Sequence, residues 1–335
     1  MQPIKNPIGR FAIYVFLILF LLYSLVPFLW TTLQSFKTQR QAAAPIPLFV
    51  FEPTLESYGR LWLDSTPDNL AVLATGLMGV IVVLVLLGVF AERLPIPRKI
   101  IYVGILGAVI AIIWGIPKIV DTAEFYDYFV NSLIVAVGAV AISVSIGCLA
   151  GYALARYSGI AGVVILLVAL AFRALPRLAF LLPYFWMGRI SGLHDTYFLV
   201  IIALVAVNQP FTIWLLRSFF MDIPREIEES AMIDGASRLE AFLKVIIPIM
   251  WPGIVAVALF TLLLAYHEFL LVRILTQSKW TLPLAMVQFV GGAKVTGQIA
   301  MQAAAAVSST IPIVLVIIFF QKQLVKGLSA GAVKG

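Results

Sequence analysis

The residues of this chain that could carry out chemistry are few, and none of them forms a catalytic motif. Glu268 follows His267, but Leu271 occupies the position at which a His-Glu-x-x-His zinc site has its second histidine. The sequence contains no Gly-x-x-x-x-Gly-Lys-Ser/Thr phosphate-binding loop and no Gly-x-Ser-x-Gly nucleophile elbow. Two separated histidines and the single cysteine, Cys148, give neither a metal site nor an intramolecular disulfide. We therefore predict that the chain is not an enzyme, binds no metal or cofactor itself, and takes its energy from a partner or a gradient.

A second group of polar residues lies inside long apolar runs, where each is costly in lipid. Arg173 and Arg177 are four residues apart and share a helix face; they line a substrate path, or they are structural partners that are buried or reach the membrane surface. Asn208 and Gln209 precede a proline, which indicates either a cavity lining or a plain helix kink. With Glu268, near the outer end of its span, these residues form our candidate substrate pathway.

These polar residues need helices to position them, and composition indicates membrane helices. The chain has 335 residues, of which 62% are hydrophobic and 12% charged, and the apolar residues fall in long runs. The net charge of +7 does not indicate nucleic-acid binding, because no basic stripe interleaved with aromatic residues occurs. We expect an all-α membrane protein, a polytopic bundle of about eight transmembrane helices. The predicted spans are Phe11–Thr31, Ala71–Ala91, Ile100–Lys118, Phe129–Ala153, Ala161–Pro183, Tyr197–Arg217, Ile249–Leu271 and Met301–Gln321.

The longest well-charged segment between two apolar runs is Asp222–Pro248, and its local signals predict two short helices. Asp222 is suited to cap the first helix, and Gly235 to end it. Ser237 and Glu240 form an S-x-x-E capping box that starts a second helix, which we expect to run to Pro248. Both helices carry apolar stripes. The pair therefore either docks into another protein or lies on the lipid headgroups.

A family resemblance favours docking. Glu229-Ser230-Ala231, Asp234-Gly235-Ala236, Phe242 and Ile247-Pro248 resemble the EAA loop of the inner-membrane permease subunits of bacterial ABC importers. Two stretches of the loop after the first span, QSFKT and PTLESYGRLW, and the tail KQLVKGLSAGAVKG are similar to the maltose-type carbohydrate branch of this family. The resemblance implies that the loop is a pair of coupling helices received by an ATPase subunit. It implies ATPase-coupling roles for Glu228, Glu229, Ala231, Asp234, Gly235, Ala236, Arg238 and Phe242.

The resemblance also implies a division of the chain. Residues 1–36 hold the first span with a cytoplasmic N-terminus, and 37–70 form an extracytoplasmic loop. Residues 119–335 form the six-helix permease core, with the cytoplasmic coupling loop at 219–248. Residues 71–118 depart from the family pattern, and we interpret them as an inserted transmembrane hairpin. Tyr266 and His267 also depart from it, because related importers often carry Trp-Asn there before Glu-Phe.

The function implied is that of a permease subunit that carries a sugar or related polyol across the bacterial inner membrane, with both termini in the cytoplasm. Its implied partners are a homologous second permease, two copies of a cytoplasmic ATPase subunit that hold ATP and Mg, an extracytoplasmic solute-binding protein and membrane lipid. The alternative from the residues alone is a gradient-driven secondary transporter or channel, which has no use for an EAA-like loop. A membrane-embedded enzyme is a more distant alternative.

Overall fold

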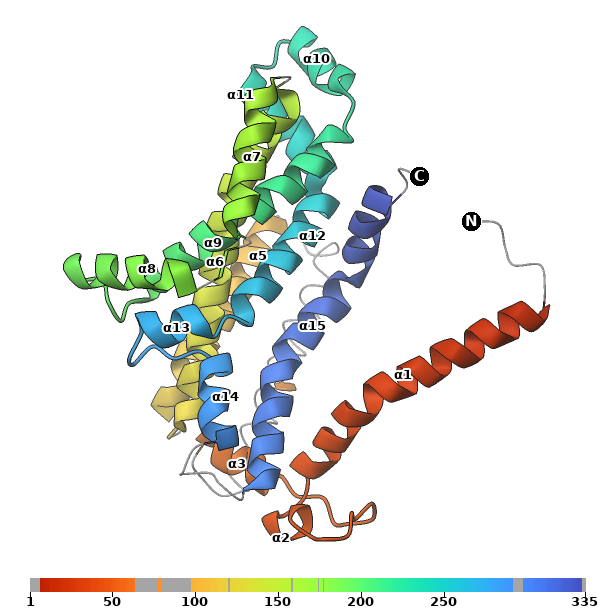
Figure 1. The fold of residues 1–335 in the computed structure, drawn as a ribbon, viewed down its shortest axis with the longest axis vertical. Helices are drawn as coiled ribbons and strands as arrows, with labels where there is room; N and C mark the ends of the chain where they lie inside the picture. The colour runs from red at the N-terminus through yellow and green to blue at the C-terminus, as the bar shows by residue number, and fades with distance from the viewer. Residues whose placement is uncertain are drawn as a thin grey trace. The chain divides into compact units, whose positions relative to one another are not determined.

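The computed structural model describes residues 7–63, 78–79, 98–119, 121–157, 159–173, 175–176, 178–291 and 298–332, and these residues contain helices and no strands (Figure 1). The expected all-α architecture is confirmed. The helices are α1 (Pro7–Ser35), α2 (Gln39–Ala42), α3 (Glu56–Leu63), α5 (Arg98–Ile119), α6 (Glu124–Arg156), α7 (Ile160–Arg173), α8 (Leu178–Ile190), α9 (Tyr197–Met221), α10 (Arg225–Ile233), α11 (Arg238–Ala241), the π-helical turn η2 (Phe242–Ile246), α12 (Ile247–Tyr266), α13 (Leu270–Leu275), α14 (Leu282–Gly291) and α15 (Ile299–Ala332).

Within the described ranges, five helices are long and apolar enough to cross a membrane: Ile13–Ser35, Glu124–Arg156, Tyr197–Met221, Arg238–Tyr266 and Ile299–Lys322. The pair α7 and α8 adds a sixth candidate if it is one broken span. Of the predicted hairpin, Ala71–Ala91 lies outside the described residues apart from 78–79, whereas Ile100–Lys118 falls within α5. The count of eight spans therefore stays a prediction.

The chain divides into two compact units, and the first comprises Met1–Asp127 and Met286–Ser309. In this unit the Trp62 ring packs edge-on against Phe125 and its indole N–H donates to Ser308 Oγ at 3.1 Å. The Lys37 side chain is buried, with its ammonium about 5 Å from the ring centroids of Trp30 and Phe51 (4.9 and 5.0 Å). Aromatic faces thus stabilise a buried cation here.

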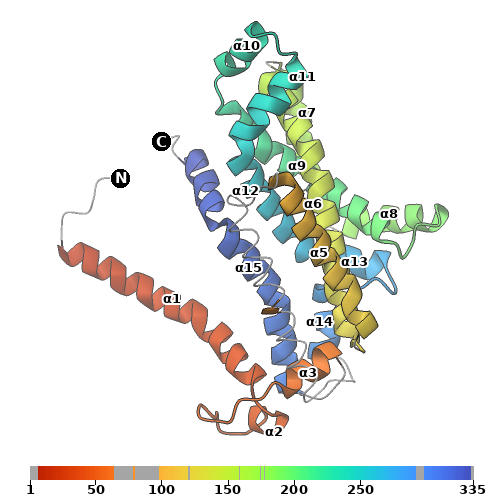
Figure 2. The same cartoon turned by 180° about the vertical axis from the view of Figure 1, so that it is seen from behind.

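The second unit comprises Tyr128–Ala285 and Thr310–Gly335 and contains the predicted coupling loop. Its centre is α9, which packs against α12 and α7. The helix α6 approaches α9 closely because Gly147 and Gly151 face it: a Cβ on Gly151 would lie 3.0 Å from the backbone nitrogen of Arg217. Both views show α10 and α11 together at one end of this unit (Figures 1 and 2).

Three sequence expectations differ from this fold. The predicted span Ala161–Pro183 is two helices bent by 92° (α7 and α8), because Pro176 has no N–H to continue a helix and disfavours helical backbone before it. The second helix of the loop does not end at Pro248, because this proline lies in the first turn of α12, where its missing N–H is tolerated. The stretch 272–300, which separates the last two predicted spans, is not a plain loop, because it includes most of α13 and all of α14.

Candidate functional site

The corner between α10 and α11 is built around Gly235. The N–H of Ala236 donates to the carbonyl of Ala231 at 3.0 Å, and the N–H of Gly235 donates to that of Met232 at 3.1 Å. This pair of bonds is the Schellman arrangement, which places its penultimate residue in a left-handed conformation. Gly235 has φ +92°. The prediction that Gly235 ends the first helix of the loop is confirmed, and the backbone requirement that only glycine meets easily is located there.

The second helix of the loop begins at the predicted capping box. Ser237 Oγ accepts the N–H of Glu240 at 3.3 Å, and Glu240 Oε2 accepts the N–H of Ser237 at 3.0 Å. The predicted cap of the first helix is wrong. Asp222 is the C-terminal cap of α9, and Pro224 precedes α10 without a side-chain cap bond, because α9 extends as far as Met221.

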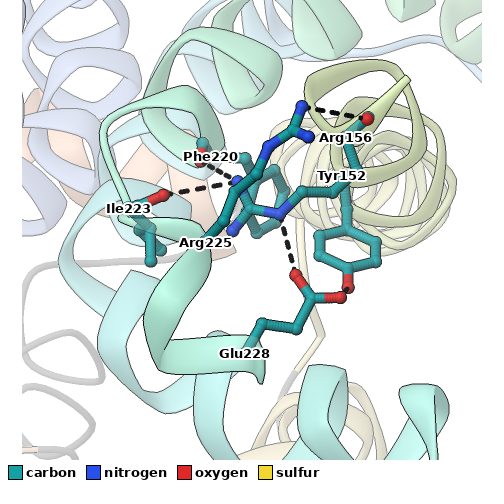
Figure 3. A network of polar contacts seen from close by, with 6 residues as sticks. All are labelled: Tyr152, Arg156, Phe220, Ile223, Arg225 and Glu228. Carbon is teal, nitrogen blue, oxygen red and sulfur yellow. Dashed lines mark hydrogen bonds and ion pairs between the residues drawn. The ribbon is translucent and has the colours of Figure 1, made fainter. Parts of the chain in front are cut away.

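Glu228, on α10, points into a polar network formed with the end of α6 (Figure 3). The residue is 8% exposed. Its carboxylate accepts a hydrogen bond from the Tyr152 hydroxyl on one oxygen and, on the other, from Arg156 Nε at 2.8 Å. Both partners lie in the last turns of α6. A carboxylate that is taken out of water is thereby paired with a cation and hydrogen-bonded.

Two arginines connect the ends of α6, α9 and α10 by donating hydrogen bonds to backbone carbonyls. Arg156 Nη1 donates to the carbonyls of Phe220 and Ile223, both at 3.3 Å, at the end of α9. Arg225 Nη2 on α10 donates to the carbonyl of Arg156 at 3.2 Å (Figure 3). The carbonyls of Arg156 at the end of α6, of Phe220 near the end of α9 and of Ile223 just beyond α9 thus all accept hydrogen bonds from guanidinium groups. We call Tyr152, Arg156, Arg225 and Glu228 the Glu228 network.

Phe242 is the second predicted coupling residue that faces inward. It is 4% exposed, and its ring centroid lies 4.6 Å from that of Tyr152 and 6.3 Å from that of Phe220. It belongs to a buried core that draws on α6, α9, the loop and α12. The other members are Cys148, Leu216, Phe220, Ile223, Ile246, Met250, Ile254 and Val257. Phe242 therefore anchors the loop to the unit.

The opposite face of the loop is open. Three large apolar side chains are exposed there: Ile233 (85%), Leu239 (62%) and Leu243 (53%). Of the predicted coupling residues, Glu229, Asp234, Gly235 and Arg238 are exposed, and Ala231 and Ala236 are partly exposed. The eight predicted residues thus divide into two anchors, Glu228 and Phe242, and six residues on or near the open face.

Sequence reasoning did not identify Tyr152 and Arg156 as functional residues. They are four positions apart and therefore share one helix face at the end of a span. Tyr152 and Arg156 belong to the same short segment, GYALARYSG, which closes the predicted span Phe129–Ala153. This shared helix face is the one sequence signal that could have drawn attention to the pair, and it does not specify Glu228 as their partner.

The candidate pathway residue Gln209 takes part in a neutral polar network between helices. Ser143 Oγ on α6 donates to Gln209 Oε1 at 2.9 Å, and Gln209 Nε2 donates back to the Ser143 carbonyl at 3.1 Å. Ser143 Oγ also lies 3.2 Å from Thr212 Oγ1, which is 3.2 Å from Thr261 Oγ1 on α12. Hydroxyl and amide groups thus join three membrane helices without placing a charge between them.

The other candidate pathway residues lie at different places. Asn208, in the middle of α9, is 3% exposed, and its Oδ1 has no hydrogen-bond partner within the part of the chain that the structure describes. The Arg173 guanidinium, at the end of α7, lies 4.7 Å from the ring centroid of Phe211. Glu268 caps α13 by accepting the N–H groups of Leu270 and Leu271 at 3.0 and 3.2 Å. Arg177 lies outside the described residues.

The end of α9 remote from the loop is fastened by Asp195. Its Oδ1 accepts the backbone N–H groups of Gln277, Ser278 and Lys279 at 2.8, 2.9 and 3.3 Å, and its Oδ2 accepts Ser278 Oγ at 2.7 Å. Partial burial raises the pKa of this carboxyl group, but the four hydrogen bonds outweigh burial and lower the pKa to about 2. The neighbouring Asn131 bridges the Tyr197 hydroxyl (2.6 Å) and the Trp280 carbonyl (2.8 Å).

Comparison with known proteins places this geometry in a family. Residues 143–330 match the family described as "Binding-protein-dependent transport system inner membrane component". The trehalose transport system permease protein SugB of Mycobacterium tuberculosis is 34% identical over 63% of this chain and 78% of its own length. The trehalose/maltose transport system permease protein MalG of Thermococcus litoralis is 34% identical over 64% of this chain and 77% of its own.

A solved structure supports the fold. The crystal structure of a bacterial ABC transporter involved in the import of the acidic polysaccharide alginate contains a chain that superposes with a TM-score of 0.65. The match covers 96% of this chain and 98% of that one at 19% sequence identity. At this identity the likeness concerns the arrangement of the helices.

Proposed function

We propose a transport role for this chain, which belongs to the family of binding-protein-dependent transport system inner membrane components. In this proposal it is the permease subunit of an ABC importer, and loop 219–248 couples it to a separate ATPase. The supporting observation is that Ile233, Leu239 and Leu243 are exposed on a loop whose other face is anchored by buried contacts. Exposed apolar side chains on a fixed scaffold mark a surface that another protein covers.

The chemistry of the relatives indicates the substrate class. SugB and MalG are named for trehalose and maltose transport, and a third relative, MdxG of Bacillus subtilis, for maltodextrin. We therefore propose a sugar or related polyol as the substrate. Such ligands need convergent hydrogen-bonding groups in an apolar setting, and the buried Asn208 Oδ1 on α9 is a candidate acceptor.

The remaining partners follow from the importer assignment. The second subunit of the membrane core is a homologous permease, and an extracytoplasmic binding protein delivers the substrate. Two ATPase subunits hold ATP and Mg, and this chain holds neither. With the loop in the cytoplasm of a bacterial cell, α12 leads out and α15 returns, so the C-terminus is cytoplasmic; the predicted eight spans place the N-terminus there too.

The energy source separates this function from a gradient-driven carrier or channel. The complete complex, co-expressed and reconstituted in proteoliposomes, is expected to take up a radiolabelled disaccharide only when ATP is present on the ATPase side and the binding protein on the other. Dissipating ion gradients with ionophores should leave this uptake unchanged. Uptake that needs a gradient and not ATP would assign the chain to the secondary transporters.

The docking surface is tested by Leu239→Asp, which places a charge on the exposed apolar face. We expect retention of the ATPase subunit during purification to fall about tenfold, the loss typical of one interface anchor. Val50→Asp is the matched control, because Val50 is 94% exposed and lies in the other compact unit, outside the loop. Equal ATPase retention by both variants would contradict docking through Leu239.

A further inference from the structure

We propose that Tyr152 and Arg156 are positioning residues for coupling, because they fasten α10 to the end of α6. Loop 219–248 is continuous in sequence with α9 and α12, and the Glu228 network adds α6 as a third helix that moves with it. This inference rests on the proposed function and deepens it. It identifies the residues that pass a movement of the loop into the rest of the membrane unit.

The first support is the direction of the contacts. Arg156 reaches from α6 to Glu228 on α10 (Nε to Oε2, 2.8 Å), and Arg225 reaches from α10 back to the Arg156 carbonyl (3.2 Å). These contacts join residues that are 72 and 69 positions apart in the sequence. Because the bonds run both ways across the same gap, sliding α10 along α6 breaks both together.

The second support is the occupancy of the carboxylate. Tyr152 and Arg156 hold different oxygens of Glu228, so the group cannot rotate without losing a partner. The ion pair is largely shielded, with side chains 16% and 11% exposed for Arg156 and Glu228. Separating such a pair leaves an uncompensated charge in a poorly hydrated place, which opposes separation more strongly than at the surface.

The third support is that the Glu228 network contacts the buried core that anchors the loop, through the ring of Tyr152. The Tyr152 ring packs against Phe242 of η2 at 4.6 Å and against Phe220 of α9 at 5.7 Å, centroid to centroid. Four elements, α6, α9, α10 and η2, thus meet at one tyrosine. By contrast, the ion pair Lys244–Glu240 is exposed (71% and 46%) and joins two residues of one helical stretch, so it transmits nothing to α6.

The test uses variants that remove the network while keeping the packing. Tyr152→Phe removes one hydroxyl and keeps the ring, and Arg156→Lys keeps the charge but loses the fork that serves Glu228 and two carbonyls at once. The readout is disaccharide imported per ATP hydrolysed by the complete complex in proteoliposomes, at a fixed amount of assembled complex. A purely structural role would change the amount of complex and leave this ratio unchanged.

We expect the ratio to fall about fivefold for Tyr152→Phe and about tenfold for Arg156→Lys, while ATP hydrolysis per complex stays within about twofold of wild type. The control Arg60→Gln removes an exposed Arg–Glu pair (64% and 39% exposed) on α3 and should leave the ratio unchanged. A wild-type ratio in Tyr152→Phe overturns the inference. Absence of ATP-dependent uptake in the wild-type complex instead overturns the proposed function, so the two failures are distinguishable.

Discussion

Near each end of α9 a carboxylate reaches a distant part of the chain, but the two carboxylates use different donors. Glu228, beyond the end of α9, takes side-chain donors from α6 and is buried. Asp195, just before its start, takes three backbone N–H groups and a serine hydroxyl, and it is only partly buried. Backbone donors fix the shape of a turn, whereas side-chain donors fix one helix to another. The Glu228 end therefore joins two helices, as the proposed coupling requires, whereas the Asp195 end fixes the turn at residues 277–279 to the start of α9.

The two ends also share a glycine with positive φ. Gly235, in the coupling loop, has φ +92°, and Gly192, before Asp195, has φ +70°. A Cβ added at either position would meet no atom within 4 Å, so the backbone angle is the constraint at both. The two glycines therefore have the same backbone requirement, but only Gly235 lies in the proposed coupling loop. A substitution at Gly192 is for this reason a matched control for the same substitution at Gly235.

The largest effect is expected from a substitution at Gly235. Gly235→Pro is incompatible with φ +92°, so the corner must rearrange, and we expect uptake to fall to background while the chain stays in the membrane. In the milder pair, Gly235→Ala and Gly192→Ala should each lower the free energy of unfolding by about 1 kcal/mol. Only Gly235→Ala should lower uptake per assembled complex. Normal uptake by Gly235→Pro would show that the corner does not couple.

Local chemistry made the corner predictable from the sequence. The glycine stop and the box formed by Ser237 and Glu240 depend on residues that lie within five positions of one another. The apolar runs likewise indicated an all-α membrane protein, because lipid leaves few other ways to satisfy the backbone. The same reasoning assigned Asp222 wrongly to the N-terminal cap of the first loop helix. Its residue type suits a cap, but the length of α9 makes it the C-terminal cap of that helix instead.

Pairing across the chain was not predictable. Nothing in the spacing around Glu228 specifies Tyr152 and Arg156 as its partners, because the contact depends on how α6 packs against α9. The same holds for the 92° bend between α7 and α8, because the apolar run Ala161–Pro183 indicated one span and Pro176 alone does not fix whether a helix kinks or breaks. The motif also does not separate exposed residues from buried ones. Glu228 and Phe242 were predicted as residues that contact the ATPase, and both are buried and anchor the loop.

A smaller effect is expected in the polar layer between the two ends of α9. Asn208→Ala removes a buried acceptor that has no partner among the described residues, so we expect uptake to fall about tenfold with normal assembly. Gln209→Ala instead breaks two hydrogen bonds to Ser143 and should lower the free energy of unfolding by about 1 kcal/mol. The amount of assembled complex should fall as a result. Uptake and assembly are measured on both variants. Normal uptake by Asn208→Ala would remove Asn208 from the substrate pathway.

The smallest effect concerns the Asp195 end and is a pH dependence. Hydrogen bonds lower the pKa of Asp195 from 3.8 to about 2, so its stabilisation is fully present above pH 3.8 and is lost as the pH falls through about 2. After allowance for solvent screening, we expect amide protection at Gln277 and Ser278 to be about threefold lower at pH 3 than at pH 6, with intrinsic exchange rates corrected. Asp195→Asn keeps an oxygen acceptor without a titratable proton, so its protection should not change over this range. If the wild-type protection is equally constant, the carboxylate does not hold this turn, and the proposed contrast between the two ends of α9 rests on Glu228 alone.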